Sequence, residues 1–423
     1  MGLVLTARTG QRADTRDDDA EQSLEELGSL AITAGAAVVE RQIQRRPRPD
    51  SATQIGSGKV EELKALVRFH EADTVIFDRE LTPVQQRNLE KALDSKVLDR
   101  TQLILDIFAH RARTKEGQLQ VELAQLDYLL PRLTGHGLAM SRLGGGIGTR
   151  GPGETKLETD RRRIHQRIQA LKEDLEHVRK GRSTQRRQRQ AVPLATIALV
   201  GYTNAGKSTL FNRLTNSGVL ADARMFATLD PTVRHTTLPS RRRVLLSDTV
   251  GFIRNLPTTL VNAFRATLEE VNEAELLLHV VDASSLQAPE QTEHVMATLQ
   301  EIGVEATPQI LVLNKTDQLA EPLAVEALAR RILADPARQP AGAVAISART
   351  GEGMQGLLDK IDQTLKLDPV SACTFRIPAQ EGGPMHLLHE FARVLSTRYD
   401  GDVCEIKAEA PESIRRRLAP YQM

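Results

Sequence analysis

The sequence predicts a mixed α/β protein whose largest part is a mostly parallel, doubly wound sheet. Three observations lead to this prediction. A glycine-rich turn directly follows an apolar run that ends at Val200, which is the strand–turn–helix order of a parallel sheet domain. Further apolar runs alternate with helical patterns as far as about residue 366. Ahead of this region, apolar residues recur at helical spacing on both sides of a glycine-rich stretch, which is typical of packed helices.

A chain of 423 residues is too long for a single hydrophobic core, so we expect several domains. Residues 1–112 alternate short strand and helix patterns, which predicts a small α/β domain. Residues 113–191 carry the helical apolar stripes and are expected to form an α-helical hairpin. Residues 192–367 would form the doubly wound sheet. Residues 368–423 read as strand, helix, strand and helix, which predicts a small α+β C-terminal domain.

The composition is that of an ordinary globular protein. The chain is 40% hydrophobic and 26% charged with a net charge of +1, so any attraction to nucleic acid must be local. Aromatic residues make up only 3%, which argues against a stacking platform for single-stranded nucleic acid. Cys373 and Cys404 suit reduced thiols better than a disulfide scaffold, and no apolar run approaches the roughly 20 residues of a membrane helix. We therefore expect a cytoplasmic protein without a membrane span.

The glycine-rich turn matches the phosphate-loop pattern G-x-x-x-x-G-K-[ST]. Glycines let the backbone wrap closely around an anion, and the helix that begins near Lys207 adds the positive end of its dipole. Lys207 would reach the β- and γ-phosphates of a nucleotide, and the Ser208 hydroxyl would ligate Mg²⁺. The residues expected to bind nucleotide here are Gly201, Tyr202, Thr203, Asn204, Ala205, Gly206, Lys207, Ser208 and Thr209.

A later apolar strand ends at Asp248 and continues into Thr249, Val250 and Gly251. An aspartate at the end of a strand can hold Mg²⁺ through water, and the Gly251 N–H can reach the γ-phosphate. These four residues are therefore further candidates for nucleotide binding.

Two more strand ends predict that the base is guanine. The strand Gln309–Asn314 ends in Asn-Lys-x-Asp, and the Asp317 carboxylate can accept two hydrogen bonds from guanine N1–H and N2–H₂. Adenine lacks these donors and would leave the acid unsatisfied. The Lys315 stem can lie along the base, and backbone N–H groups near Ala348 can donate to guanine O6. The residues expected around the base are Asn314, Lys315, Thr316, Asp317, Ser347, Ala348 and Arg349.

Basic residues gather in the hairpin region although the whole chain is nearly neutral. Between Lys156 and Arg189 there are 12 basic and five acidic residues. Such a cluster attracts nucleic acid by releasing counterions, and the glycines of the connector 144–153 allow close approach to a folded RNA. A solvated helix face is the plain alternative. The candidate RNA contacts are Arg142, Arg150, Lys156, Arg161, Arg162 and Arg163.

Together these motifs resemble the translation-factor-like class of P-loop GTPases, and within it the HflX family of ribosome-associated GTPases. The resemblance covers nearly the whole chain, and its most family-specific part is Gly144–Glu158. The segments that carry it are Gly144–Glu158, Gly201–Ser208, Phe226–Thr232, Asp248–Arg254 and Asn314–Asp317.

The resemblance implies a switch threonine at Thr228, whose hydroxyl and carbonyl would close over Mg²⁺ and the γ-phosphate only with GTP. With it, Phe226, Ala227, Leu229 and Asp230 become candidate nucleotide-binding residues. Lys207, Thr228 and Gly251 are then the expected catalytic residues, and Ser208 and Thr228 the expected metal ligands. Phe252 stands where Ras-like enzymes place a water-orienting glutamine, which predicts slow intrinsic hydrolysis.

The resemblance also implies partners. It points to the large ribosomal subunit and its RNA, to stimulation of hydrolysis by the ribosome, and to splitting or rescue of stalled ribosomes by a monomer. A GTP-dependent factor that remodels or modifies RNA, or assembles ribosomes, is the alternative. No methyl-donor fingerprint or metal-ligand cluster in the sequence supports RNA modification. A small regulatory GTPase is disfavoured because it would not need a basic hairpin.

Two smaller questions stay open on the sequence alone. Asn204 resembles the asparagine of cation-assisted GTPases, where it helps to hold K⁺ beside the phosphates, but it is equally suited to stabilising the turn. A second glycine-lysine stretch at Gly56–Lys59 has Val60 where the phosphate-loop pattern requires Ser or Thr. We favour a helix start there over a second nucleotide site.

Overall fold

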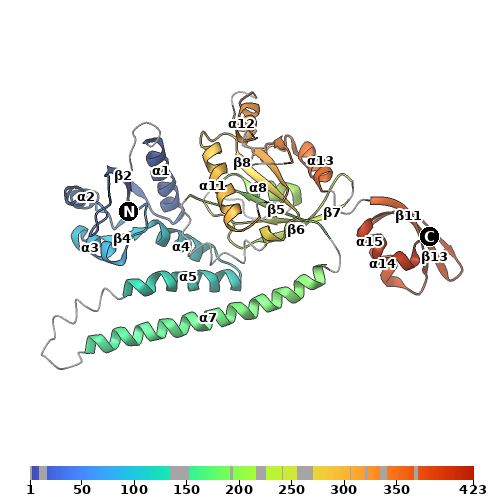
Figure 1. Ribbon diagram of the computed structural model, residues 1–423, viewed down its shortest axis with the longest axis horizontal. Helices are drawn as coiled ribbons and strands as arrows, with labels where there is room; N and C mark the ends of the chain where they lie inside the picture. Colours follow the sequence, from blue (N-terminus) through green and yellow to red (C-terminus); the bar gives the residue numbers. More distant parts are fainter. Residues whose placement is uncertain are drawn as a thin grey trace. The chain divides into compact units, whose positions relative to one another are not determined.

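The computed structural model describes residues 2–8, 17–133, 152–190, 194–215, 225–240, 242–254, 270–304, 306–319, 323–333, 341–365 and 370–423. The chain groups into two compact units. The first runs to Val178 and includes Arg224–Leu229, and the second contains the central sheet and the C-terminal residues (Figure 1). The two units are described separately below.

The first unit begins with a four-stranded parallel sheet in the order β2-β1-β3-β4. Each parallel step requires a helical crossover, and the alternating pattern of the sequence supplies it. Helices α2 and α3 pack against each other over a core that includes Leu63, Phe77 and Leu89. The elements are β1 (Gly2–Arg8), α1 (Asp17–Thr33), β2 (Val38–Arg45), α2 (Ser57–Phe69), β3 (Thr74–Phe77), α3 (Pro83–Leu93), β4 (Lys96–Asp99) and α4 (Arg100–Arg111).

Two helices, α5 (Lys115–Leu133) and α7 (Pro152–Gln190), follow the small sheet. The two helices lie side by side (Figure 1). Their leucine stripes meet in a common seam that includes Leu119, Leu171 and Leu175, as the helical spacing predicted. Arg167 of α7 forms a bidentate pair with Glu122 of α5, with both N···O distances 2.7 Å. The glycine-rich connector falls mainly on residues 134–151, which lie outside the described residues.

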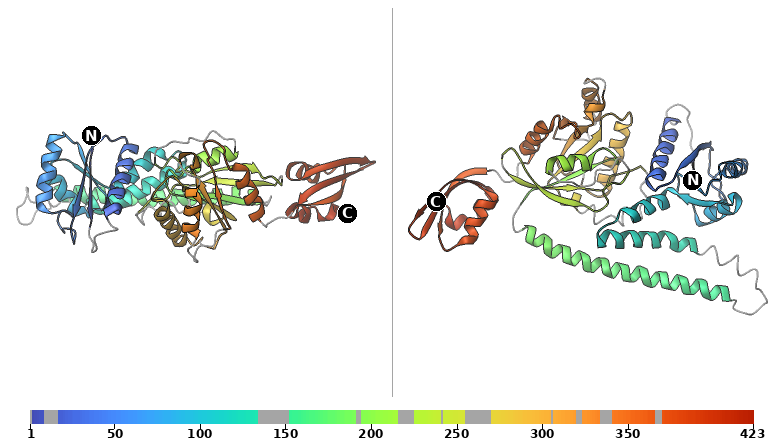
Figure 2. Two further views of the ribbon diagram at one scale, coloured as in Figure 1. Left: turned by 90° about the horizontal axis from the view of Figure 1, so that it is seen from above. Right: turned by 180° about the vertical axis from the view of Figure 1, so that it is seen from behind.

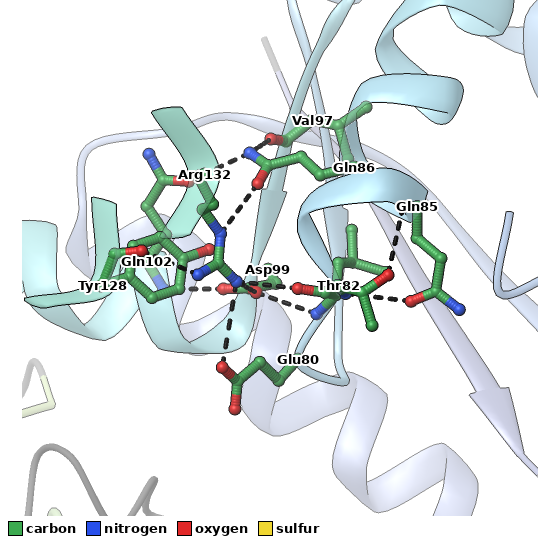
Figure 3. A network of polar contacts seen from close by, with 10 residues as sticks. Glu80, Thr82, Gln85, Gln86, Val97, Asp99, Gln102, Tyr128 and Arg132 are labelled. Carbon is green, nitrogen blue, oxygen red and sulfur yellow. Dashed lines mark hydrogen bonds and ion pairs between the residues drawn. The ribbon is translucent and has the colours of Figure 1, made fainter. Parts of the chain in front are cut away.

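A polar network centred on Arg132 fastens α5 to the small sheet domain (Figure 3). The Arg132 guanidinium lies 3.4 Å from the centre of the Tyr128 ring and donates to Gln86 Oε1 at 3.1 Å. It also donates to the Leu81 carbonyl at 2.8 Å and to Asp99 Oδ2 at 3.3 Å. Asp99 is buried and caps α4, so one guanidinium ties together several elements of the first unit. The last turn of α5 is thereby fixed to the small sheet domain.

The second unit is built on a six-stranded sheet in the order β10-β9-β8-β5-β7-β6. All pairs are parallel except β6 with β7, which confirms the predicted mostly parallel, doubly wound sheet. Its inner strands β5, β8 and β9 are almost entirely buried and read as nearly continuous apolar runs. The elements are β5 (Thr196–Gly201), α8 (Lys207–Thr215), β6 (Thr232–Thr237), β7 (Arg243–Asp248), β8 (Leu276–Asp282), α11 (Ala288–Glu301), β9 (Gln309–Asn314), η1 (Thr316–Gln318), α12 (Leu323–Leu333), β10 (Ala343–Ala345) and α13 (Met354–Thr364).

The C-terminal residues form a three-stranded antiparallel sheet in the order β11-β13-β12, with its core against short helices (Figure 2). The α+β class is confirmed, but the predicted order of elements missed a strand. A turn at Gly401, with φ +58°, splits the second strand-like stretch into a β-hairpin. The elements are β11 (Val370–Pro378), α14 (Gly382–Phe391), β12 (Arg393–Asp400), β13 (Val403–Pro411), α15 (Glu412–Arg417) and η2 (Ala419–Tyr421).

Three further expectations can be set beside this fold. The four-domain division stays a prediction, because its boundaries near 191 and 367 fall on residues that the structure does not describe. Helix α2 begins at Ser57 with Gly56 as its N-cap, in agreement with a helix start at Gly56–Lys59. Among the described helices, none combines the length and the apolar character that crossing a bilayer requires.

Candidate guanine nucleotide site

Most of the candidate nucleotide-binding residues gather at one edge of the six-stranded sheet. They follow the carboxyl ends of β5, β7, β9 and β10, which are neighbours or near neighbours in the sheet. In a parallel doubly wound sheet, this edge is where ligands bind. The exceptions are residues 226–229, which belong to the first unit.

The turn between β5 and α8 packs closely against the sheet at both of its motif glycines. Gly201 has φ +149° and Gly206 has φ +94°. A Cβ added at Gly201 would lie 2.2 Å from the Val280 carbonyl oxygen, and one at Gly206 would lie 2.2 Å from the Asn314 side-chain nitrogen. Both positions therefore require glycine for their backbone conformation and for space.

Lys207 opens α8, and its ammonium group is buried inside the turn. The ammonium donates to the carbonyls of Gly201 at 3.0 Å and Tyr202 at 2.8 Å. Burial lowers the pKa of Lys207 to about 8, and the negative charge of Asp248 opposes this shift. An anion in the turn would stabilise the charged ammonium and raise its pKa. The side chain is therefore suited to binding a phosphate group there.

The oxygens needed by a hard cation lie beside the lysine. The Ser208 hydroxyl donates to Asp248 Oδ2 at 2.8 Å, and Asp248 is fully buried at the end of β7. Thr249 fixes this strand end by donating its hydroxyl to the Leu199 carbonyl at 2.6 Å. Hydroxyl and carboxylate oxygens are the ligands that Mg²⁺ prefers, so the Ser208 and Asp248 pair fits this ion.

Gly251 lies directly against the phosphate turn. A Cβ added there would be 2.9 Å from Thr203 Cα and 3.0 Å from Lys207 Nζ. The next residue, Phe252, continues the contact through its backbone, since its carbonyl accepts from Thr203 N–H at 2.8 Å. The Phe252 side chain is only 3% exposed. A buried hydrocarbon ring cannot orient an attacking water, and slow intrinsic hydrolysis stays a prediction.

Asn314 connects the two halves of the pocket. Its side-chain nitrogen donates to the Ala205 carbonyl of the phosphate turn at 2.8 Å, and its Oδ1 accepts from the Ala348 N–H at 2.9 Å. The residue is 2% exposed, so both bonds lie in the interior. Buried amides whose groups are all bonded hold their neighbours rigidly. The phosphate turn and the loop after β10 are thus fixed to each other.

Asp317 is held as a carboxylate at the end of the Asn-Lys-x-Asp motif. Ser347 donates its hydroxyl to Asp317 Oδ1 at 2.7 Å. This hydrogen bond is the largest cause of a lowered Asp317 pKa, which partial burial opposes and the charge of Arg349 assists. An ionised, acceptor-only group is the required partner for the two donors of a guanine edge.

Two side chains at this edge were not anticipated. Asp282, the last residue of β8, pairs through Oδ2 with Lys315 Nζ at 2.6 Å. Lys315 has φ +66°, so this ion pair helps to define where its side chain runs. Arg213 of α8 donates to the carbonyl of Ala348 at 3.2 Å and so braces the base loop from behind. The sequence offered one signal for Asp282, which is a polar residue at the end of an apolar strand.

Residues 225–229, which we call the switch segment, pack within the first unit. The Phe226 ring makes an edge-to-face contact with Phe108 of α4, with centroids 4.7 Å apart. The Met225 N–H donates to the Thr33 hydroxyl at the end of α1 at 3.3 Å. Phe226 has φ +55° and is 2% exposed, and Thr228 is buried with it. The segment is therefore anchored to α1 and α4.

The candidate RNA contacts divide into described and undescribed residues. Arg142 and Arg150 lie outside the described residues, and only the helical backbone is described at Lys156. Arg161, Arg162 and Arg163 are exposed on α7, and the Arg163 side chain is 76% exposed despite an i,i+3 approach to Asp160 at 4.0 Å. Such a weak surface pair leaves the arginine available for phosphate.

Three protein families match consecutive parts of the chain. Residues 21–109 match a family described as GTP-binding GTPase N-terminal, and residues 111–189 match GTP-binding GTPase Middle Region. Residues 196–315 match a family described as 50S ribosome-binding GTPase. The matches thus extend from the small sheet domain through the hairpin to the end of β9.

Proteins named GTPase HflX are similar over most of the chain. The one from Caldanaerobacter subterraneus subsp. tengcongensis is 47% identical over 401 residues, covering 95% of this chain and 90% of the relative. The one from Escherichia coli K12 is 46% identical over 87% of this chain and 84% of the relative. A crystal structure of a GTP-binding protein from Sulfolobus solfataricus in complex with GDP is 26% identical, covers 86% of this chain and 98% of that chain, and has a TM-score of 0.45.

Proposed function

The chain belongs to the HflX family of ribosome-associated GTPases, and on that premise we propose that it uses Mg²⁺ and GTP to act on the large ribosomal subunit, splitting or rescuing stalled ribosomes. The observation that carries this proposal is the exposed arginine run Arg161–Arg163, on a helix packed in the same unit as the switch segment. The proposed RNA-binding surface and the segment proposed to contact the γ-phosphate therefore belong to the same compact unit.

The proposed pocket divides the work of binding and hydrolysis among its residues. Asp317 would select guanine, and Lys207 would stabilise charge on the β- and γ-phosphates. The Gly251 N–H would donate a hydrogen bond to the γ-phosphate. Ser208 and, in the GTP state, Thr228 would hold Mg²⁺, which supplies charge neutralisation between the phosphates when bound. Positioning and electrostatics of this kind are most of what a phosphoryl-transfer site provides.

Slow intrinsic hydrolysis follows from the same residues. The buried Phe252 ring offers no group that could orient water. The switch segment carries Thr228 and is anchored to α1 and α4 through Phe226 and Met225. A partner that reorganises this segment would complete the site, and we propose that the large ribosomal subunit is that partner.

Electrostatics support RNA as the surface that the hairpin contacts. Basic side chains release counterions when they approach phosphates, so the affinity should fall steeply as salt rises. The Arg132 network and the Arg167–Glu122 pair hold α5 and α7 to the small sheet domain. A rigid hairpin loses less conformational entropy on binding than a loose one. The basic face is therefore suited to act as a preorganised RNA contact.

The test combines sedimentation and turnover. The full-length protein is mixed with separate large and small subunits in the presence of a nonhydrolysable GTP analogue or GDP, and GTP turnover is measured with each subunit. We expect cosedimentation with the large subunit that depends on the GTP analogue, and faster turnover in its presence. The variant Arg161→Ala/Arg162→Ala/Arg163→Ala should lose binding but keep basal turnover.

Other outcomes would redirect the proposal. Equal binding to both subunits, or turnover that ribosomes do not change, would contradict it. Binding confined to immature particles would favour the assembly-factor alternative instead. Splitting itself is measured by light scattering of 70S ribosomes, which should fall after addition of the protein with GTP and stay constant with GDP.

A further inference from the structure

The base pocket contains a buried carboxylate oxygen that is covered by an exposed arginine. Asp317 Oδ1 is bonded to Ser347, but Oδ2 is shielded from solvent and, among the residues that the structure describes, receives no hydrogen bond of good geometry. Its nearest cation is Arg349, whose Nη2 lies 2.5 Å from Oδ2 in an ion pair.

Arg349 is well placed to move. Its side chain is 71% exposed, whereas that of Asp317 is 10% exposed. The backbone beneath it is fixed instead, because Arg213 donates to the carbonyls of both Ala348 and Arg349. An exposed arginine on an anchored backbone can leave a carboxylate by rotating its side chain alone. The base loop does not need to unfold for the pair to open.

The chemistry of the pair matches that of the base. A guanidinium presents planar N–H donors to a carboxylate, and guanine presents the same kind of N–C–N donor edge through N1–H and N2–H₂. Both would use the same oxygen of Asp317. We propose that Arg349 is an internal competitor of guanine, which covers Asp317 when no base is bound and is displaced when one enters. The inference rests on the proposed base pocket and adds a residue that sets how readily this pocket is filled.

The competition has a calculable size. Pairs between an exposed arginine and a carboxylate are weak, and their loss should change nucleotide affinity by about two- to five-fold. Because salt screens exposed charges, the effect should shrink as ionic strength rises. The association rate should carry most of the change, since the arginine must leave before the base can bind.

The experiment measures association and dissociation of a fluorescent GDP analogue with the full-length protein by stopped flow. Arg349→Ala should bind about two- to five-fold faster than wild type at low salt, and the difference should disappear near 1 M salt. Arg349→Lys keeps a point charge without the planar donors, so its association rate should lie between those of wild type and Arg349→Ala. Arg330→Ala is the matched control, because the Arg330 side chain is also largely exposed, at 81%, and pairs with Glu326 within α12.

The possible outcomes distinguish a failure of the competitor role of Arg349 from a failure of the proposed base pocket. Slower or weaker binding by Arg349→Ala would show that the side chain holds the base instead of competing with it, and an unchanged rate would also overturn the inference. Asp317→Asn tests the pocket: it should abolish the preference for GDP over ADP. If that preference is lost while Arg349→Ala behaves as wild type, the pocket stands and only the competitor role fails.

Discussion

The candidate nucleotide pocket of the second unit and the switch segment of the first unit differ in how they are held. The pocket is joined within a single unit by buried bonds from Asn314, which reach both the phosphate turn and the loop of Ala348. The switch segment is held in the other unit by the Phe226–Phe108 contact and the Met225–Thr33 bond. We therefore expect the affinity for guanine to depend on packing within the second unit. We expect the rate of hydrolysis to depend on the conformation of the switch segment in the first unit.

This difference suggests separate physical roles for the pocket and the switch segment. A pocket cross-linked by satisfied buried groups is rigid, so it should select its base without a partner. Contacts such as the Phe226–Phe108 ring pair and the Met225 hydrogen bond to the Thr33 hydroxyl can be released at modest cost, so the segment suits a switch. Variants in the pocket and variants in the switch segment should therefore change different measured properties of the protein.

The largest effect is expected at Lys207. Replacing Lys207 with Ala removes the buried ammonium beside the phosphate turn. GTP turnover should fall about 10²- to 10³-fold, because a preorganised charge is lost where negative charge develops. The preference for GDP over ADP should remain, since Asp317 is untouched. Steady-state phosphate release measures the turnover, and competition binding measures the base preference. A loss of base preference in this variant would contradict separate roles for Lys207 and Asp317.

Asn314→Ala should have the next largest effect, on binding. It leaves the Ala205 carbonyl and the Ala348 N–H without their buried partner. GDP affinity should fall by about 10- to 100-fold, and the free energy of unfolding by about 1–3 kcal/mol. Calorimetry and denaturant unfolding provide the measurements. Gln355→Ala on exposed α13 is the control, and an equal loss in both variants would count against the cross-link.

The third prediction concerns pH. The Lys207 pKa is about 8 in the fold against an ordinary value of 10.5, so between these values the unfolded chain binds more protons. The free energy of unfolding of the nucleotide-free protein should therefore rise with pH across this window, by at most about 1.4 kcal/mol per pH unit. Unfolding at pH 8, 9 and 10 should show this rise in wild type but not in Lys207→Met. Parallel curves would argue that the ammonium is not buried.

The smallest effect is expected at the switch segment. Phe226→Leu and Phe108→Leu remove the same ring contact from opposite sides. Edge-to-face pairs contribute about 0.5–1.5 kcal/mol, so basal GTP turnover should change about two- to ten-fold in both variants while GDP affinity stays constant. A change in one variant only, or a change in GDP affinity, would disprove the assignment of this contact to the switch.

The candidate residues at the sheet edge could be located from the sequence because their motifs directly follow strands. Asp248, Asn314 and Ser347 could be placed at one sheet edge from the rule that parallel strands share their carboxyl ends. The mostly parallel sheet and the helical seam of Leu119, Leu171 and Leu175 followed from periodicity in the same way.

What the sequence missed depends on contacts between distant residues. The Phe226–Phe108 contact joins positions 118 residues apart, and neither residue shows a local pattern that would identify its partner. The Asp282–Lys315 pair depends on the register of β8 with β9, which places Asp282 beside Asn314. The β12–β13 hairpin was overlooked because its turn at Gly401 is short. Register and packing partners are properties of the folded chain.

The most direct test of the account compares affinity and turnover in one experiment. The dissociation constant for a nonhydrolysable GTP analogue and the maximal rate of GTP hydrolysis are measured with and without large ribosomal subunits. We predict that the subunit raises the hydrolysis rate by at least about ten-fold, the effect of roughly 1.4 kcal/mol on the barrier, and that it also tightens binding of the analogue, because subunit binding that depends on the analogue requires this reciprocal effect. An increase in affinity without a change in hydrolysis rate would contradict the account.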